Sequence, residues 1–490
     1  MFLETYHAYE QYAFGYDVLK PITMNGSNFD SVLAGWGGTI VDAMSTMIVM
    51  GLGDSEEYKR ALEHVKKTDF TSTSVHHPER EALGVVSLFE LTIRYLGGLV
   101  SAYELNGERP EERFLVDKAI SLADKLAVGW YKHNRIPFNY VNINEGKPDN
   151  LSDTANYAEA GTLTLEWSRL SKYTGDDRYR NLSEGSAIAL SENEGIFPNL
   201  YAMEIYPTNE STSGDLVTFS GGTDSFYEYL SKYPYLIGDP QHPFLETYGQ
   251  SIKSAKQYLV SHPQLKPFTF LTSYSEKLFN GTRNSFSHLG CFAGANIALY
   301  GRLRRSDEDT QLGLEIAESC AHIVDAASTR LEAGGWGWRD RKTGRAQGHK
   351  FVSPGQILHE EDFGVFLTIE DFNGSPEIQE SVLYGYRMTG DPYWRDLGWA
   401  LFGAMKTYLD TGRGIAGIQN VNDRSSKLDD ETPTYFYAEI MKYLYLLFDD
   451  PDHYSLDDYV LNTEGHPFKV QHNEAFGKVQ GNFPYKRLNL

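Results

Sequence analysis

Residues 169–182 read RLSKYTGDDRYRNL and join two amphipathic helical runs through one glycine. Gly175 suits the left-handed position that follows the last turn of a helix, and the acidic residues after it begin the next helical run. Residues 101–114, SAYELNGERPEERF, and 385–398, GYRMTGDPYWRDLG, repeat this arrangement. The three stretches therefore predict helical hairpins joined by short turns.

Helical periodicity extends along the whole chain. About fourteen runs, from residues 3–16 through 433–447, have an apolar spacing of 3.6 residues, and strand-like alternation is confined to short pieces such as 268–272. Repeated helix pairs form either an open solenoid or a closed barrel of hairpins. The repeat is irregular and long loops (190–220 and 328–372) separate some helices, which favours an all-α closed barrel.

Composition and charge limit the classes of function. The 490 residues are 41% hydrophobic and 13% aromatic, enough for a large core, and no apolar run reaches the length of a membrane span. No Pro-rich or Gly/Ser-rich linker marks a domain boundary. A formal net charge of −23 argues against nucleic acid or anionic lipid as a partner, because phosphate groups need clustered Lys and Arg. Abundant aromatic and acidic side chains instead favour a neutral carbohydrate ligand.

These sequence features leave the cellular compartment of the protein undecided. The chain begins in a helix-like run without a signal peptide, so it is either cytosolic or has lost an upstream targeting segment. Cys291 and Cys320 lie on neighbouring helical runs and are either one disulfide of an oxidising compartment or two buried thiols. Six Asn-X-Ser/Thr triplets favour the secretory pathway, although such triplets also occur by chance. They begin at Asn25, Asn150, Asn181, Asn209, Asn280 and Asn373.

Residues 85–103, VVSLFELTIRYLGGLVSAY, carry two opposite charges inside an apolar run. Glu90 and Arg94 are four residues apart and share one face of a helix. Burying either charge without a partner is costly. The two residues are therefore either an internal ion pair that orients a buried helix or part of a functional site.

Further acids interrupt apolar or aromatic helical runs. A single buried acid is usually structural, but a barrel would point many of these carboxylates at one axis, where each needs a proton, a cation or a sugar hydroxyl. Such a funnel suits glycoside hydrolysis, in which one carboxylic acid protonates the leaving oxygen, one carboxylate activates water and Ca²⁺ absorbs part of the charge. His288 either donates to a hydroxyl or is an ordinary core histidine. The acids are Glu159, Glu166, Asp224, Glu228, Glu377, Glu380, Glu439 and Glu464.

The order of these motifs resembles the class I α-1,2-mannosidases, glycoside hydrolase family 47, from near residue 5 to near residue 468. The resemblance implies an (αα)7 barrel of residues 1–470 that a C-terminal segment closes at one end, followed by a tail of residues 471–490. It also implies removal of α-1,2-linked mannose from N-glycans with inversion, helped by Ca²⁺. The matching segments are YEQYAFGYDVLKP, GWGGTIVDAMSTMIVMGL, SLFELTIRYLGGLVSAY, AEAGTLTLEW, GGTDSFYEYL, SHLGCF, PEIQESVLYGYRMTGDPYWR, AEIMKYLYLLF and NTEGHPF.

The resemblance implies a role for each matching residue. Glu90 would be the general acid, directly or through a water molecule, with Asp224 as the rival candidate, and Glu377 would be the general base. Thr463 would bind Ca²⁺ through its hydroxyl and carbonyl, with waters completing most of the shell. The residues that would contact the sugar or surround the cation are Arg94, Glu159, His288, Glu380, Tyr435, Glu439 and Glu464.

The resemblance also bears on compartment and partners. Cys291 and Cys320 match the family's disulfide pair, which implies the secretory pathway lumen or the cell exterior. The expected partner is a mannose-containing oligosaccharide or N-glycan, bound by a monomer. The alternative is a lectin-like protein that recognises mannose-rich glycans with weak or no hydrolysis. The joint presence of acid, base and cation ligand favours the enzyme.

The chain departs from the family pattern in several places. Ser375 stands where the family has an arginine beside the base, which removes a planar group with five donors. Ser45 replaces an acid, residues 433–435 (PTY) replace E-S-F, and residues 331–338 (LEAGGWGW) replace the G-L-G-P-E loop. None of these changes removes a proposed proton carrier. They affect which glycan and which linkage the protein prefers.

Overall fold

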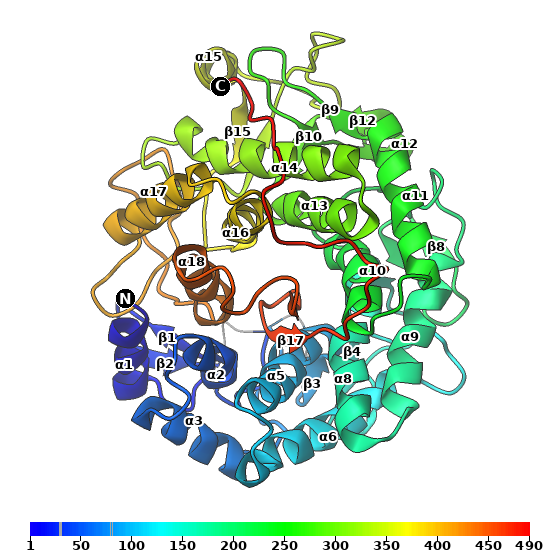
Figure 1. Ribbon diagram of the computed structural model, residues 1–490, viewed down its shortest axis with the longest axis vertical. Helices are drawn as coiled ribbons and strands as arrows, with labels where there is room; N and C mark the ends of the chain where they lie inside the picture. The colour runs from blue at the N-terminus through cyan, green and yellow to red at the C-terminus, as the bar shows by residue number, and fades with distance from the viewer. Residues whose placement is uncertain (29–31, 79, 81) are drawn as a thin grey trace.

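The computed structural model describes residues 1–28, 32–78, 80 and 82–490, and its helices form two rings around one axis (Figure 1). The inner ring consists of α2 (Gly38–Val49), the continuous run η1 (Leu91–Leu96) and α5 (Gly97–Leu105), α8 (Thr164–Thr174), α10 (Asp224–Leu236), α13 (Phe292–Arg304), α16 (Glu377–Thr389), and η6 (Phe436–Ile440) with α18 (Met441–Phe448). The outer ring consists of α1 (Phe2–Tyr12), α3 (Glu56–Lys67), α6 (Phe114–Leu126), α9 (Arg178–Ser191), α11 (Pro243–Tyr258), α14 (Asp307–Ala321) and α17 (Tyr393–Tyr408).

Contacts between neighbouring inner helices close the ring. Each packs on the next, from α2 through α5, α8, α10, α13, α16 and α18 back to α2. Six inner helices also pack on the outer helix that follows them in the chain, for example α13 on α14. Outer helix α1 completes the set, because the rings of Phe2 and Tyr6 meet Tyr437 of η6 edge-on. The expected (αα)7 barrel is therefore confirmed.

The hairpin turns have the predicted geometry. Gly175 ends α8 with φ 72° and Gly390 ends α16 with φ 67°. Gly107, two residues beyond α5, has φ 83°. A residue with a side chain is strained in this left-handed region, whereas glycine enters it freely and lets the chain reverse directly into the outer helix.

Short antiparallel sheets of two or three strands lie at the barrel ends. The strand expected at 268–272 is β10 (Phe270–Leu271), which pairs with β9 (Val260–Ser261). The other loop strands are β1 (Val18–Lys20), β2 (Asn25–Ser27), β3 (Val85–Ser87), β4 (Tyr140–Asn142), β5 (Lys147–Pro148), β6 (Ala155–Asn156), β7 (Glu204–Ile205), β8 (Thr212–Ser213), β11 (Ser273–Ser275), β12 (Gly281–Arg283), β13 (Ser285–Ser287), β14 (Gly335–Gly337) and β15 (Phe366–Ile369). The short helices are α4 (Leu88–Glu90), α7 (Tyr157–Gly161), α12 (Glu276–Phe279), α15 (Pro354–Phe363), η2 (Pro110–Glu112), η3 (Ala127–Gly129), η4 (Leu289–Cys291) and η5 (His322–Ala326).

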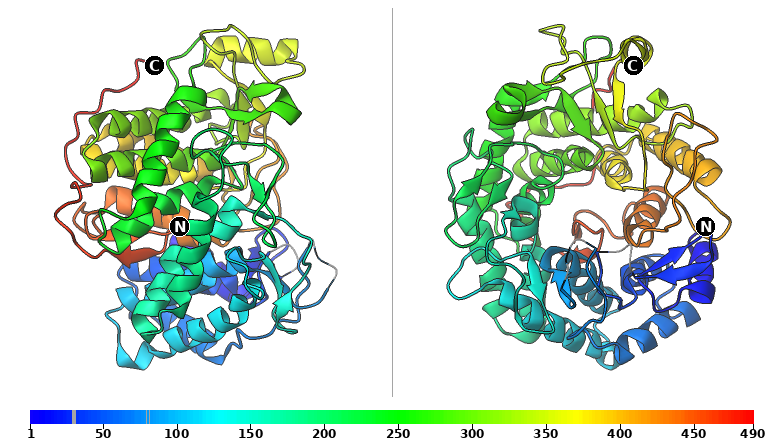
Figure 2. Two further views of the ribbon diagram at one scale, coloured as in Figure 1. Left: turned by 90° about the vertical axis from the view of Figure 1, so that its right-hand side faces the viewer. Right: turned by 180° about the vertical axis from the view of Figure 1, so that it is seen from behind.

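A C-terminal β-hairpin closes one end of the barrel, as expected. Strands β16 (Tyr459–Leu461) and β17 (Pro467–Lys469) enter where the inner helices finish (Figure 1). The hydroxyl of Ser101 in the middle of α5 donates to the carbonyl of Pro467 at 2.8 Å, and the N–H of Lys469 donates to Oε1 of Glu104 in the last turn of α5 at 2.5 Å. The tip of this hairpin, residues 462–466, lies in the middle of the ring of inner helices (Figure 2, right). Thr463 and Glu464 of this tip line the cavity at the opposite end, where loops lead into the inner helices.

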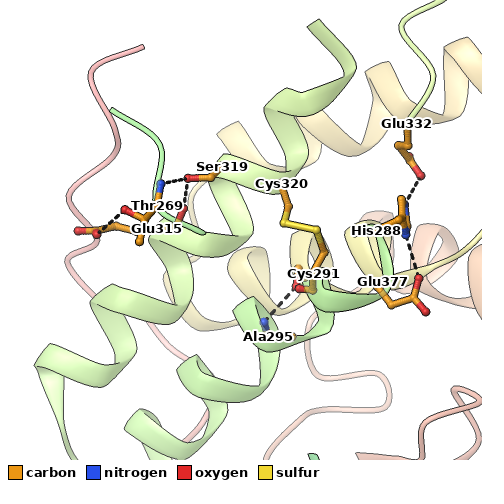
Figure 3. The surroundings of a disulfide bond; sticks show 10 residues. Thr269, His288, Cys291, Ala295, Glu315, Ser319, Cys320, Glu332 and Glu377 are labelled. Atoms are coloured by element: carbon orange, nitrogen blue, oxygen red, sulfur yellow. Dashed lines mark hydrogen bonds and ion pairs between the residues drawn. A yellow bond between two sulfur atoms is a disulfide. The ribbon is translucent and has the colours of Figure 1, made fainter. Parts of the chain in front are cut away.

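The predicted disulfide between Cys291 and Cys320 is present. It joins η4 to the last turn of α14, with the two Cα atoms 6.0 Å apart (Figure 3). Helices α13 and α14 also approach closely, because a Cβ on Gly313 would lie 2.3 Å from the backbone nitrogen of Ala298. Within the described residues, no helix is both long enough and apolar enough to cross a membrane.

Candidate active site

A cavity of about 400 Å³ opens at the barrel end where the inner helices begin. Glu166, one of the acids singled out from the sequence, lies beneath it, fully buried. The barrel therefore gathers carboxylates from distant helices at one axis, as the sequence predicts. The predicted site residues that line the cavity are Glu90, Arg94, Glu159, Asp224, Glu377, Glu380, Tyr435, Glu439, Thr463 and Glu464, together with Glu228.

Several carboxylates occupy the first turn of a helix. Glu90 lies in α4, Glu159 in α7, Asp224 in α10 and Glu377 in α16. Backbone N–H groups of a first turn lack partners within the helix, and the helix dipole favours a negative charge there by roughly 0.3–1 kcal/mol. The Ser87 side chain caps the turn of Glu90 by accepting its N–H at 3.2 Å. The acids sit at helix starts, and the barrel brings these starts together.

One wall of the pocket, the arginine wall, is organised by Arg94. Its Nε donates to Glu90 Oε2 at 2.8 Å, and its Nη1 donates to Thr434 Oγ1 at 3.2 Å and to the carboxylate of Glu464. Arg94 lies in the π-helical segment η1, and such widened turns are frequent at functional sites. Glu90 and Arg94 therefore form the ion pair that was one of the two alternatives, and both residues also line the pocket.

A second wall, the histidine wall, presents Glu377 to the pocket, and His288, Glu332 and Gln379 lie behind Glu377. His288 Nδ1 lies 2.9 Å from Glu377 Oε2, and its Nε2 lies 2.8 Å from Glu332 Oε2 (Figure 3). Burial acts to lower the pKa of His288, but hydrogen bonds to Glu332 and Glu377 outweigh it and raise the pKa to about 9. The ring therefore donates from both nitrogens at neutral pH. It stands behind Glu377, with neither nitrogen free for a sugar hydroxyl.

Glu332 is a functional candidate that the sequence reasoning missed. Its side chain is buried and bonds His288 and Gln379, although it belongs to the loop 331–338 that departs from the family pattern. The available signal was an acid flanked by Leu331 and Ala333. A loop position has no periodicity to show which way its side chain points, so this signal is weak.

Asp224 lines the same pocket and has no basic partner among the described residues. Its Oδ1 accepts the N–H of Ser225 at 2.8 Å. Burial raises the pKa of Asp224 to about 7, and the nearby charges of Glu377 and Glu228 add to the rise. In the described part of the chain no Lys, Arg or His side chain forms an ion pair with this carboxylate. Asp224 therefore holds its proton below about pH 7 and loses it above.

Carboxylates crowd the floor of the pocket around Thr463. Lys232 bonds Glu228 and lies 3.2 Å from Glu380. Burial raises the pKa of Glu380 to about 7 despite this lysine, and burial with neighbouring negative charges raises the pKa of Glu439 well above its usual range. The floor thus offers only oxygen ligands and an excess of negative charge, which is the donor set that Ca²⁺ prefers.

The spacing of these oxygens limits how a cation is held. Within the described residues, the one group of three His or acidic side chains with ligand atoms mutually within 4.8 Å is His7, Glu10 and Glu57, outside the pocket. A cation at the floor would therefore rely on Thr463 and on waters between it and the carboxylates. The residues fit Ca²⁺ on these terms, because its shell accepts hydroxyl, carbonyl and water oxygens.

Buried polar contacts beneath the floor hold the hairpin tip. Lys442 Nζ donates to Gly465 O at 2.7 Å and to Ser45 Oγ at 2.9 Å, and Ser45 Oγ lies 2.8 Å from His466 Nδ1. Burial lowers the pKa of Lys442 to about 7, although the charge of Glu439 counteracts it. Ser45, a departure from the family pattern, thus meets a buried lysine through a neutral hydroxyl.

The rim beside Glu377 is formed by small polar groups. Ser375 Oγ donates to Asn373 Oδ1 at 2.8 Å, and the hydroxyl of Tyr435 donates to the Asn373 carbonyl at 3.3 Å. The Arg94 guanidinium lies 5.7 Å from the centre of the Tyr435 ring. With Ser375 in this place, the rim offers a hydroxyl where the resembling family would offer a guanidinium.

Known proteins are similar to this chain in sequence and in architecture. Residues 1–470 match the model of glycosyl hydrolase family 47. Proteins named mannosyl-oligosaccharide α-1,2-mannosidase from Coccidioides posadasii and Penicillium citrinum are each 33% identical to this chain, over 488 and 497 residues. The alignments cover 95% and 96% of this chain and 88% and 91% of theirs. The solved α-1,2-mannosidase from Trichoderma reesei matches with a TM-score of 0.87 and 28% identity, over 96% of this chain and 97% of that one. The chain therefore belongs to glycosyl hydrolase family 47.

Proposed function

We propose that this protein is a Ca²⁺-dependent, inverting exo-α-mannosidase that removes α-1,2-linked mannose from high-mannose N-glycans or related mannosides. The observation that carries the proposal is the pocket, in which Glu90, Asp224 and Glu377 face one cavity of about 400 Å³. The hairpin tip closes the floor, so the cavity admits the end of an oligosaccharide and excludes a chain that passes through. Relatives named α-1,2-mannosidases support the linkage.

Glu377 is the general base of the proposed reaction. His288 engages its Oε2, which leaves Oε1 to accept a proton from water. The water oxygen forms a bond to the anomeric carbon while the bond from that carbon to the glycosidic oxygen breaks. Attack from the face opposite the leaving oxygen inverts the configuration.

Asp224 is the proposed general acid. The family resemblance favours Glu90, but Glu90 is engaged by Arg94 at 2.8 Å, whereas Asp224 has a pKa of about 7 and a proton to give. That proton passes to the glycosidic oxygen as the bond breaks, so the leaving sugar departs as an alcohol. Glu90 and Arg94 then orient the sugar and balance charge.

Thr463 and the floor carboxylates are the proposed cation site. When bound, Ca²⁺ offsets their negative charge and binds sugar hydroxyls. The high pKa values of Glu439 and Glu380 support this assignment, because burial and mutual repulsion disfavour their charged forms until a cation compensates. The Cys291–Cys320 disulfide supports a further proposal, an oxidising compartment such as the secretory pathway lumen or the cell exterior.

The decisive experiment offers α-1,2-, α-1,3- and α-1,6-linked mannobioses and a high-mannose N-glycan, and follows the first released anomer by proton NMR. We expect turnover of α-1,2 linkages, β-mannose as the first product, and loss of activity with EDTA that Ca²⁺ restores. First release of α-mannose would contradict inversion, and activity insensitive to EDTA would contradict the cation. Binding of the glycan without turnover would favour the lectin-like alternative.

A further inference from the structure

We propose that Glu332 is a positioning residue for hydrolysis, which holds His288 so that one oxygen of Glu377 stays engaged and the other stays free for the attacking water. The proposal rests on the function of Glu377 proposed above. Glu332 does not line the pocket, so it acts through His288 and has no direct contact with the sugar.

Both oxygens of Glu332 are used. Oε2 lies 2.8 Å from His288 Nε2, and Oε1 accepts from Gln379 Nε2 at 2.7 Å. His288, Glu332 and Gln379 are 2%, 3% and 2% exposed. A buried carboxylate with two fixed donors has one orientation, and it transmits that orientation to the imidazole ring.

The backbone around these side chains is equally constrained. The N–H of His288 donates to the carbonyl of Gly334 at 3.0 Å, so the loop that carries Glu332 also holds the backbone of His288. On the other side, Ser381 of α16, one turn after Glu377, donates to the carbonyl of Cys291 at 2.7 Å. The loop, the disulfide-linked turn and the helix of the base thus form one connected unit.

The chemical need for Glu332 follows from the two nitrogens of imidazole. A neutral histidine donates from one nitrogen only, and a proton left on Nε2 would point the bare Nδ1 at the carboxylate of Glu377. Glu332 accepts a hydrogen bond from Nε2 of His288 and stabilises the doubly protonated ring, which then donates to Glu377 from Nδ1.

Other groups surround this pair. Among the described residues, the ring of Phe372 lies 5.5 Å from the ring of His288. The titratable groups that act electrostatically with Glu377 from its own and neighbouring elements are Asp224, Glu332, Glu380, Tyr435 and Glu439.

The test is Glu332→Gln, which keeps the shape and removes the charge. We expect kcat on an α-1,2-mannobiose to fall about tenfold with KM within about twofold, since positioning acts on the chemical step. The acidic limb of the kcat pH profile should move to higher pH by about half a unit, because Glu377 then faces a neutral imidazole that stabilises its charge less. Glu360→Gln is the matched control, a fully buried carboxylate bonded to Arg339 at 2.7 Å and remote from the pocket.

A second variant covers a failure to fold. Gln379→Leu removes the donor to Glu332 Oε1 without changing any charge, and we expect about a threefold fall in kcat. If folded Glu332→Gln keeps the wild-type kcat and pH profile, the positioning role is wrong, even if its melting temperature falls. If wild-type protein does not hydrolyse any mannoside, the proposed function itself fails. The two failures are therefore distinguishable.

Discussion

The two walls of the pocket hold their carboxylates with different cations. On the arginine wall, Arg94 bonds Glu90 and Glu464, and a guanidinium keeps its charge throughout the pH range in which proteins fold. On the histidine wall, His288 bonds Glu377 and Glu332, and an imidazole can lose its charge. The arginine wall therefore has a permanent charge pattern, whereas the histidine wall makes the base sensitive to pH and to its supporting carboxylate.

Asp224, which lines the same pocket, is paired neither with arginine nor with histidine among the described residues. Burial without a basic partner raises its pKa to about 7, so it acts by holding a proton. The pocket thus contains a carboxylate paired with arginine, one paired with histidine and one kept neutral by burial. Carboxyl groups of the same chemical type acquire separate roles from their surroundings.

The largest effect is expected on the histidine wall from Glu377→Gln. The amide retains an acceptor for His288 but cannot take a proton from water, so kcat should fall by at least about 1000-fold. Single-turnover kinetics on an α-1,2-mannobiose measures this loss. Glu360→Gln, remote from the pocket, should retain wild-type turnover. Residual activity above a tenth of wild type would mean that another group is the base.

A smaller effect, about 100-fold in kcat, is expected from Asp224→Asn, which removes the proton donor. Glu90→Gln should lower kcat less than Asp224→Asn does and should raise KM more, because the main contact of Glu90 is with Arg94. Wild-type kcat should fall as pH rises through about 7, since Asp224 then loses the proton that the leaving oxygen needs. Asp224→Asn should also lack this alkaline limb. A retained limb in Asp224→Asn, with a larger loss in Glu90→Gln, would make Glu90 the acid.

The smallest effect on turnover is expected from opening the disulfide, which supports the histidine wall alone. Replacing Cys291 and Cys320 by serine should lower the free energy of unfolding by about 3–4 kcal/mol, from the loop that the bond closes. The fall in kcat should stay below about tenfold, because Ser381 still binds the Cys291 carbonyl. Urea unfolding measures the first quantity and mannobiose hydrolysis the second. Unchanged stability would contradict the structural role of the bond.

Features that depend on a few neighbouring residues could be predicted from the sequence. Gly175 and its counterparts predict the hairpin turns because a left-handed residue is a property of the backbone at that position. The spacing of Glu90 and Arg94 predicts their contact because residues four apart meet on one helix face. The disulfide and the carboxylates that line the pocket also followed, through helical patterning and resemblance to a family with the same motif order.

Contacts between segments that are distant in the sequence could not be predicted from it. His288 was expected at the sugar but stands behind Glu377, since Glu332 of a separate loop occupies its other nitrogen. Ser45 is a small residue in a buried helix, and only the folded chain shows it against Lys442 and His466. Neither relation has a sequence spacing that could reveal it.

Helical hairpins with acids at helix starts can be predicted from this sequence, because periodicity, turn glycines and capping residues act over a few residues. The pairing of Glu90 with Arg94 already follows from their spacing, but the folded barrel was needed to show that His288 meets Glu377 and that no basic side chain of the described residues pairs with Asp224. Arginine holds Glu90 and histidine holds Glu377, whereas burial, helped by the charges of Glu377 and Glu228, raises the pKa of Asp224 to about 7. The charge state of a group depends on the dielectric and the charges within a few ångströms, and barrel closure brings many of those neighbours from distant segments to Glu377 and Asp224.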